Sequence, residues 1–267
     1  MAPYDFEAPD ADVILRSSDG KELRVHRVIL SLTSPIFQDM FSLPQPTEPP
    51  TQIPTIDVPE SSDILKPFIQ YLYPRSPPKI SDLAMWEALY TAADKYDAEA
   101  VMETLRDMLI SQFLETSPVR VYALASHWGF EEEAKIASRG TLKMDLSKGF
   151  PEEDAKLMGS IACQKLCLLH LQRRDKARVL VSGCYHRFSH QFSQNCSCPP
   201  MDYNNLTRAL SVRLSTRPWL TAEELYEEAA RMRSPRMCSD NCRNAYKNIH
   251  AWFSLILNDL SNLPQTT

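Results

Sequence analysis

The spacing of apolar and polar positions near the N-terminus predicts two strands followed by two helices. Residues 12–16 form an apolar stretch behind an aspartate, and residues 22–25 alternate polar and apolar side chains as a strand with one solvated face does. Residues 18–21, S-D-G-K, accept the positive φ of a hairpin turn. After His26 the apolar period becomes helical, and the pair at 34–35, S-P, can cap and begin a second short helix.

Beyond these elements the pattern predicts a loop, an edge strand and three helices. Residues 44–54 hold five prolines without an apolar period, which favours an extended surface loop. Residues 53–58 form a strand candidate, and Pro54 confines it to a sheet edge because proline cannot donate to a central ladder. Helical spacing of apolar residues then predicts helices over 61–73, 82–96 and 98–114.

The remainder of the chain is predicted to be helical. One helix begins at Ser117-Pro118 and ends at Gly129, and residues 131–142 form its antiparallel partner. Residues 151–181 are mostly helical in pattern, and Gly183 is expected to end that run.

The N-terminal pattern resembles the opening of a BTB/POZ domain. The residues that carry the resemblance are Asp12, Val25, His26, Arg27, Val28, Leu30, Ser34, Phe37, Met40 and Phe41. The stretch A-A-D-K-Y-D at 92–97 is similar to the family's signature there, and M-F-S-L-P-Q at 40–45 looks like a variant of fungal members. The resemblance implies an α+β fold in which a short β-sheet is flanked by helices, followed by an all-α C-terminal region.

This interpretation divides the chain into three parts. Residues 1–115 would form the BTB/POZ domain, and residues 116–183 are similar to the BACK-type helical extension that follows many such domains. Residues 184–267 form a helical tail that contains cysteines and histidines and resembles no known family.

Composition narrows the class of protein. The chain has 267 residues, and 43% of them are hydrophobic, enough for a sizeable core. A net charge of −5 argues against a general nucleic-acid binder. The N-terminus lacks the pattern of a signal peptide, and no apolar run reaches the ~18 residues of a membrane span. We expect a protein of the cytoplasm, the nucleus or both, with no membrane partner.

Seven cysteines, an odd number, argue against a disulfide framework and leave thiols or metal ligands. Two close pairs far apart in sequence could bind a structural zinc through four thiolates. These candidate cysteines are Cys196, Cys198, Cys238 and Cys242. The C-x-C pair is tighter than usual zinc spacing, and three other residues could replace some thiols: Cys184, His186 and His190. Reduced thiols without metal are the alternative.

No pattern predicts an enzyme or a cofactor other than this possible zinc. His26 is expected to be a core histidine, because no nucleophile or paired carboxylate accompanies it in sequence. The pair His186/His190 lacks the glutamate of a zinc protease motif. Cys163, Cys167 and His170 share one helical face among leucines, which favours a packed core stripe. The basic run 173–178 is expected to be a solvated helix face, with a phosphate-binding patch as the alternative.

The resemblance also implies partners. Family members dimerise, and most often recruit a cullin-3 ubiquitin ligase scaffold, so the hairpin and first helix over 13–32 would carry a homodimer face. Asp12 and Arg24 match positions of a charged pocket near that interface, with a strand-end pair of solvated charges as the alternative. Phe37, Met40 and the loop after Phe41 lie where members contact cullin-3. The C-terminal part would bind a substrate to be ubiquitinated.

Two departures keep other interpretations open. Cullin-3 binders often carry a glutamate two residues beyond the apolar position, and none follows Leu43 at that spacing. Only 11 residues precede Asp12, too few for the extra strand and helix of transcription-factor members, so a monomer or a less intimate dimer stays open. The alternative functions are a transcriptional or chromatin-associated regulator with a zinc-stapled tail, and a scaffold that only self-associates.

Overall fold

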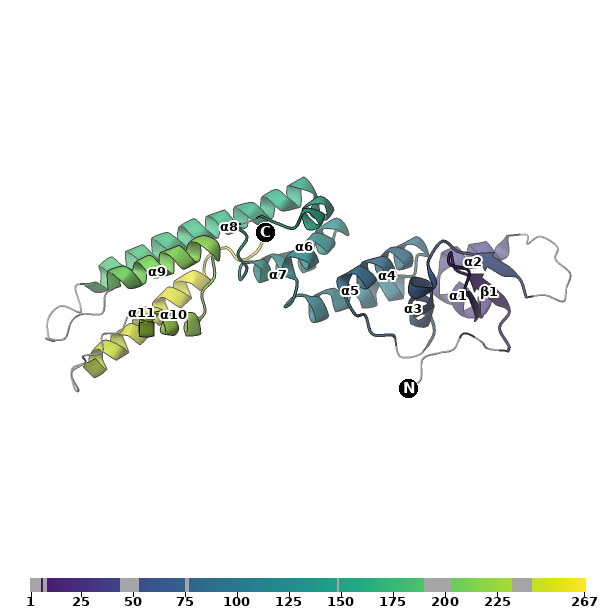
Figure 1. Cartoon of the computed structure of the whole chain (residues 1–267), viewed down its shortest axis with the longest axis horizontal. Coiled ribbons are helices and arrows are strands. Elements are labelled where there is room, and N and C mark those ends of the chain that lie inside the picture. Colours follow the sequence, from purple (N-terminus) through teal and green to yellow (C-terminus); the bar gives the residue numbers. More distant parts are fainter. Residues whose placement is uncertain are drawn as a thin grey trace. The chain divides into compact units, whose positions relative to one another are not determined.

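The structure is a computed structural model, and the residues it describes are residue 6 and residues 9–43, 53–74, 77–147, 149–189, 203–231 and 242–267. Within them, the side chains of 184–189, 203–204 and 242–249 are not described. The chain divides into two compact units (Figure 1), an N-terminal unit over Met1–Phe113 and a helical unit over Leu114–Thr267. Each unit is described by itself.

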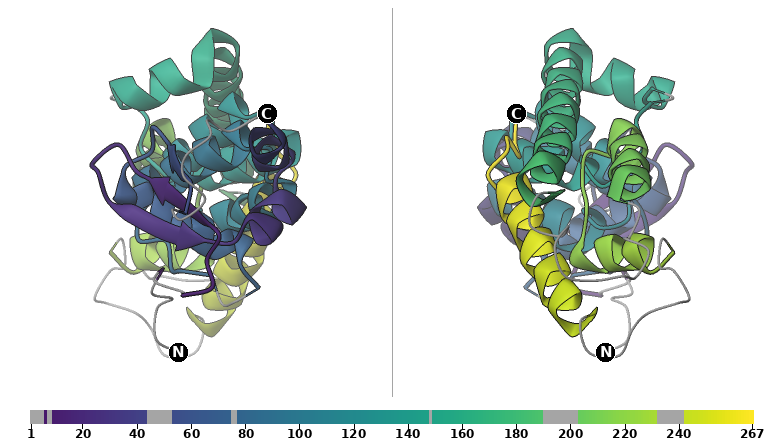
Figure 2. Two further views of the ribbon diagram at one scale, coloured as in Figure 1. Left: turned by 90° about the vertical axis from the view of Figure 1, so that its right-hand side faces the viewer. Right: turned by 90° about the vertical axis from the view of Figure 1, so that its left-hand side faces the viewer.

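A three-stranded sheet begins the N-terminal unit. Strands β1 (Val13–Arg16) and β2 (Glu22–Val25) form an antiparallel hairpin, and β3 (Thr55–Asp57) pairs in parallel with β1, giving the order β2-β1-β3. The sheet faces the viewer in the left-hand view of Figure 2. Gly20 supplies the positive φ of +79° in the turn. The prediction that the 53–58 strand lies at a sheet edge is confirmed, since β3 is an outer strand.

Among its described residues, the N-terminal unit also has five helices: α1 (Arg27–Thr33), α2 (Pro35–Ser42), α3 (Ser62–Leu72), α4 (Leu83–Lys95) and α5 (Glu99–Phe113). The hairpin turn is tied to α3, because the Asp19 carboxylate accepts hydrogen bonds from the Ser62 backbone N–H (2.8 Å) and hydroxyl (2.7 Å). These bonds to Ser62 hold the pKa of Asp19 well below its usual range. An aromatic stack forms part of the core, with the Phe37 and Tyr96 ring centroids 4.5 Å apart.

Six helices form the described part of the helical unit: α6 (Pro118–His127), α7 (Glu131–Thr141), α8 (Glu152–Ser189), α9 (Tyr203–Thr216), α10 (Ala222–Arg231) and α11 (Cys242–Ser261). The first two pack on each other and on α8, as the predicted helical pair should. Figures 1 and 2 show α9 and α11 lying beside α8. The fold is therefore α+β in its N-terminal part and all-α beyond it.

Helix α8 departs from its prediction in two places. It continues through Gly183 to Ser189, so the expectation that Gly183 ends the helix is wrong. It is also interrupted at Gly159, whose φ of 73° and ψ of 171° are not helical. This conformation is almost restricted to glycine, because a Cβ atom would clash with the neighbouring backbone.

The buried face of α8 also differs from the sequence interpretation. It runs through Leu166, Leu169, Arg173, Ala177 and Val181. Cys167 is exposed and Cys163 half-buried, so the expected core stripe does not include Cys167. Arg173, expected on a solvated face, is only 2% exposed. Its guanidinium donates to backbone carbonyls. The prediction that the whole basic run 173–178 forms a solvated helix face is therefore wrong at Arg173.

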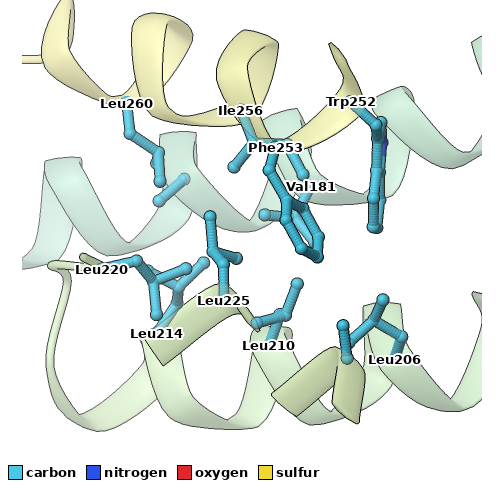
Figure 3. Packing of buried hydrophobic residues seen from close by; sticks show 12 residues of the cluster. Val181, Leu206, Leu210, Leu214, Leu220, Leu225, Trp252, Phe253, Ile256 and Leu260 are labelled. Carbon is cyan, nitrogen blue, oxygen red and sulfur yellow. The ribbon is translucent and has the colours of Figure 1, made fainter. Parts of the chain in front are cut away.

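The core of the helical unit lies between α8, α9, α10 and α11. Leucines at a spacing of four residues on α9 face large side chains of α11 across this core (Figure 3). The cluster comprises Ala177, Val181, Leu206, Leu210, Leu214, Leu220, Leu225, Ala229, Trp252, Phe253, Ile256 and Leu260. Helix α10 begins with a capping box, in which the Glu224 N–H donates to Thr221 Oγ1 (3.2 Å) and the Thr221 N–H to Glu224 Oε2 (2.9 Å).

Among the described residues, no helix is both long enough and apolar enough to cross a membrane.

Candidate protein-interaction surface

The first two helices and the residue after them carry apolar side chains that stay exposed in the described part of the N-terminal unit. Leu32 is 81% exposed, Leu43 65%, Val28 62% and Ile36 38%. We call these four the outer apolar residues. They are the exposed large hydrophobic side chains in the described part of that unit. Val28 and Leu32, four positions apart, share one face of α1. Clustered apolar exposure of this kind is typical of a protein-protein contact.

The start of α1 is fixed by the sheet and by α3. The Asp12 carboxylate accepts a hydrogen bond from the Arg27 backbone N–H at 2.8 Å, which satisfies one of the free donors in the first turn of the helix. The His26 backbone N–H donates to the Tyr73 hydroxyl at 3.0 Å, and His26 Nδ1 lies 3.0 Å from the same oxygen. His26 is therefore a structural residue that anchors the strand-to-helix junction.

The start of α2 is fixed by a buried serine. Ser34 Oγ accepts from the Phe37 N–H at 3.1 Å, and its hydroxyl donates to the Tyr96 carbonyl. Pro35 occupies the first helical position, where its missing N–H costs nothing. The predicted cap at residues 34–35 thus also ties α2 to the end of α4.

Three predicted contact residues lie on α2 at different depths. Phe37 is fully buried against Tyr96, so its side chain forms core and does not reach the surface. Met40 and Phe41 are half-buried, and the Arg27 guanidinium carbon lies 5.5 Å from the centroid of the Phe41 ring. Met40 and Phe41 are thus the members of this group that a partner can touch.

The structure does not join Asp12 and Arg24. Asp12 accepts from the first turn of α1, as described, whereas Arg24 is exposed on β2 and its backbone N–H donates to the Phe6 carbonyl at 3.0 Å. No hydrogen bond or ion pair links their side chains in the part of the chain that the structure describes. Any contact that uses both residues would need a partner between them.

The helical apolar period after His26 includes Val28 and Leu32, and by itself it does not separate core from surface; only the family resemblance assigned residues 13–32 to a homodimer face. One signal was available: Leu30, which is buried, lies on another face of α1 from Val28 and Leu32. A short helix that is apolar on two faces must bury both of them. The second face therefore predicts a further partner.

The described residues contain no metal-binding cluster of three or more histidine, cysteine or acidic side chains. Of the candidate zinc ligands, Cys196, Cys198 and Cys238 lie outside the described residues, and Cys242 begins α11 without a described side chain. The alternative ligands at 184, 186 and 190 lie outside the described side chains as well.

A partly buried polar network at the end of α4 has a structural explanation. The Tyr96 hydroxyl donates to Glu60 Oε2 at 2.7 Å, and Lys95 Nζ lies 2.7 Å from Glu60 Oε1. Burial, reinforced by the neighbouring Glu60 carboxylate, raises the pKa of Tyr96 well above its usual range. The tyrosine stays a neutral hydrogen-bond donor that holds the end of α4 to residue 60.

A half-open cavity of about 390 Å³ lies between β2 and the first turn of α3. Lys21 and Lys66 line it together with Glu22 and Asp63, so opposite charges offset one another. The Ser62 hydroxyl at this cavity donates to Asp19. Because no sign of charge dominates the cavity, the outer apolar residues are the better candidate for function.

Comparisons with known proteins agree with this geometry. The family model of the BTB/POZ domain matches residues 6–113. Kelch repeat and BTB domain-containing protein 8 of Homo sapiens is 28% identical over 131 residues, which is 48% of this chain and 21% of that protein. Its Xenopus tropicalis counterpart is 27% identical over 133 residues, 49% of this chain and 21% of that protein. The match therefore spans about a fifth of each relative.

Among solved structures, the BTB domain of zebrafish PATZ1 is similar at 20% identity and a TM-score of 0.30, covering 37% of this chain and 75% of that one. The family match, and not this structural similarity, identifies residues 6–113 as a BTB/POZ domain, a type of domain that mediates protein-protein interaction.

Proposed function

We propose, from the BTB/POZ domain at residues 6–113, that this protein is a self-associating adaptor whose helical unit binds a second protein. The observation that carries the proposal is the exposure of the outer apolar residues, foremost Leu32 at 81%. Burying such a side chain against a partner gains about 1.5–3 kcal/mol. In a symmetric dimer through this face, the outer apolar residues of both copies would be buried, so each residue would contribute once from each copy.

Self-association can be tested by light scattering after size exclusion. We expect the protein to be a dimer at micromolar concentration, and the double variant Val28→Asp, Leu32→Asp to be a monomer, because two buried carboxylates would oppose each other across the interface. Val212→Asp is the matched control, since Val212 lies on α9 and is 63% exposed, close to the 62% of Val28. A dimer that survives the double substitution refutes the proposed face.

For the partner, we infer cullin-3 recruitment through the end of α2. The inference rests on the half-buried Met40 and Phe41 and on the exposed Leu43 directly after them. Leu43→Asp should abolish co-purification with cullin-3, whereas Val212→Asp should leave it intact. Phe37 is unsuitable for this test, because truncating a fully buried aromatic would destabilise the domain. Absence of cullin-3 from the native complex would leave a scaffold that only self-associates.

The compartment we propose is the cytoplasm or the nucleus. Cys163 and Cys167, the two cysteines with described side chains, are free thiols, which fits a reducing environment. Fluorescence microscopy of a tagged full-length chain would test this assignment, and a secreted product would contradict it.

A further inference from the structure

The last five residues of the chain, Leu263–Thr267, form an extended segment that runs back over the helical unit. Figure 1 shows the chain leaving α11 and returning towards α6 and α7. Arg173 Nη1 on α8 donates to the carbonyls of Leu263 (3.2 Å) and Pro264 (3.0 Å). The Thr267 N–H donates to Ser138 Oγ on α7 at 3.2 Å. We call Leu263–Thr267 the strap.

One end of the strap is held by a buried cation. Besides its two bonds to the strap, Arg173 donates from Nε to the Pro218 carbonyl (2.8 Å) and from Nη2 to the Leu260 carbonyl (2.9 Å). Its guanidinium carbon lies 5.2 Å from the Trp219 ring centroid. These contacts hold the planar guanidinium in one orientation, so Nη1 points at the strap before the strap binds. A binding group that is already oriented in this way loses less entropy on binding.

The other end of the strap meets two buried polar side chains. Ser138 and Tyr122 are both almost fully buried, and each contacts Thr267. Burial raises the pKa of Tyr122, and its contact with Thr267 opposes that shift. The Ser138 hydroxyl donates to the Lys135 carbonyl (2.8 Å) and the Tyr122 hydroxyl to the Ala162 carbonyl (3.0 Å), so each oxygen keeps a lone pair that can accept from the strap. The surface around Ser138 and Arg173 therefore offers an acceptor at one end and a donor at the other to a backbone that lies over it.

The contacts define what such a segment must offer. Arg173 and Ser138 bind backbone atoms, so they accept an extended chain with little regard to its side chains. Two strap residues add side-chain requirements: Leu263 packs against the apolar core cluster, and Pro264 has no N–H that would need a partner. The chemistry recognised is an extended peptide with a leucine-proline pair.

We propose that the surface around Ser138 and Arg173 is a peptide-binding site, and that the strap is its resident occupant, held in cis and exchangeable for a segment of the same chemistry. The strap follows the last turn of α11 without helical or strand structure, and its residues are half-buried or exposed. Chain connection gives the strap an effective concentration of order millimolar. A partner therefore competes only after the strap loosens. This site is independent of the outer apolar residues.

A labelled peptide with the sequence of residues 261–267 tests the proposal by fluorescence anisotropy. A chain that ends at Asn262 should bind this peptide, and the intact chain should bind it at least tenfold more weakly, because its own strap competes. A peptide of reversed sequence is the matched control. Equal binding of the two peptides, or no binding to a shortened chain of unchanged helicity, would overturn the proposal.

A second measurement uses the intact chain and so does not depend on the folding of the shortened one. Excess unlabelled peptide should accelerate hydrogen exchange at the Thr267 amide, which Ser138 otherwise protects. Ser138→Ala should give the faster exchange without peptide. If neither the added peptide nor Ser138→Ala alters the exchange rate of the Thr267 amide, the proposal is contradicted. If the strap instead reaches a second copy, removing it would convert a dimer to a monomer and overturn the cis assignment.

Discussion

Replacing Arg173 by methionine should destabilise the helical unit and leave the BTB/POZ domain unchanged. Methionine keeps much of the length and the apolar stem but removes all of the hydrogen-bond donors. The carbonyls of Pro218 and Leu260, which Arg173 reaches in buried surroundings, would lose this donor, although the Leu263 N–H still donates to the Leu260 carbonyl at 3.3 Å. The carbonyls of Leu263 and Pro264 are only partly buried, so water can replace the guanidinium there.

The expected loss in the free energy of unfolding follows from the hydrogen bonds that Arg173 makes. Leaving the buried Pro218 carbonyl without this donor costs about 1–3 kcal/mol, and losing one of the two bonds to the Leu260 carbonyl costs about 0.5–1.5 kcal/mol, so together about 1.5–4.5 kcal/mol. Removing the guanidinium also relieves the cost of burying its charge, which offsets part of that sum. Burial, and secondarily the charge of Arg139, lowers the pKa of Arg173 to about 10, so the group is still charged at neutral pH. We expect a net loss of about 1–3 kcal/mol in the free energy of unfolding.

Urea denaturation followed by tryptophan fluorescence and circular dichroism provides the assay. Two units should give two transitions, and only that of the helical unit should shift. Arg174→Met is the matched control: its side chain pairs with Asp175 at the surface, so its loss should change stability by about 0.5 kcal/mol or less. An Arg173→Met protein as stable as the parent would show that charge burial outweighs the carbonyl bonds, and would refute the reasoning.

Three further outcomes are expected. Burial, and secondarily the charge of Arg173, lowers the pKa of His170 to about 4. Because the unfolded chain then binds the proton more readily, the free energy of unfolding of the helical unit should be constant above pH 6.5 and fall by about 1–2 kcal/mol on going to pH 5. His170→Gln should remove this loss in urea titrations. Ser34→Ala should lower the melting temperature of the N-terminal unit through a loss of about 1–2 kcal/mol, because both the cap of α2 and the donor to the Tyr96 carbonyl disappear. Elemental analysis of untagged protein should find about one zinc per chain if the four candidate cysteines form a thiolate site, and a metal-free preparation that remains fully folded removes that proposal.

The N-terminal fold could be predicted because local signals and packing agree there. The turn at Gly20, the cap at Ser34 and the edge position of Pro54 each depend on neighbouring residues, so the sequence displays them directly. The depth of a side chain is not local information. Phe37 matches the family pattern as well as Met40 does, but only the stack with Tyr96 shows that it belongs to the core.

The helical unit was less predictable because distant contacts decide it. Nothing in the sequence separates Arg173 from Arg174, since the carbonyls that bury Arg173 lie 45 to 91 residues further along the chain. The strap could not be foreseen for the same reason. The prediction that Gly183 ends α8 is wrong because a helix-interior glycine costs only about 1 kcal/mol, too little to end a helix by itself.

The interruption of α8 at Gly159 has a consequence for how this protein tolerates change. In a saturation library selected for folded protein, Gly159 should be depleted of every substitution, although a Cβ there would meet no atom within 4 Å apart from the backbone next to it in the chain. Gly183 has equally open surroundings and helical backbone, and alanine there should be enriched. Two glycines of one helix would thus show opposite mutational profiles, set by backbone torsion alone. Judged by side-chain contacts alone, both positions would be expected to accept substitutions, and that expectation would be wrong for Gly159.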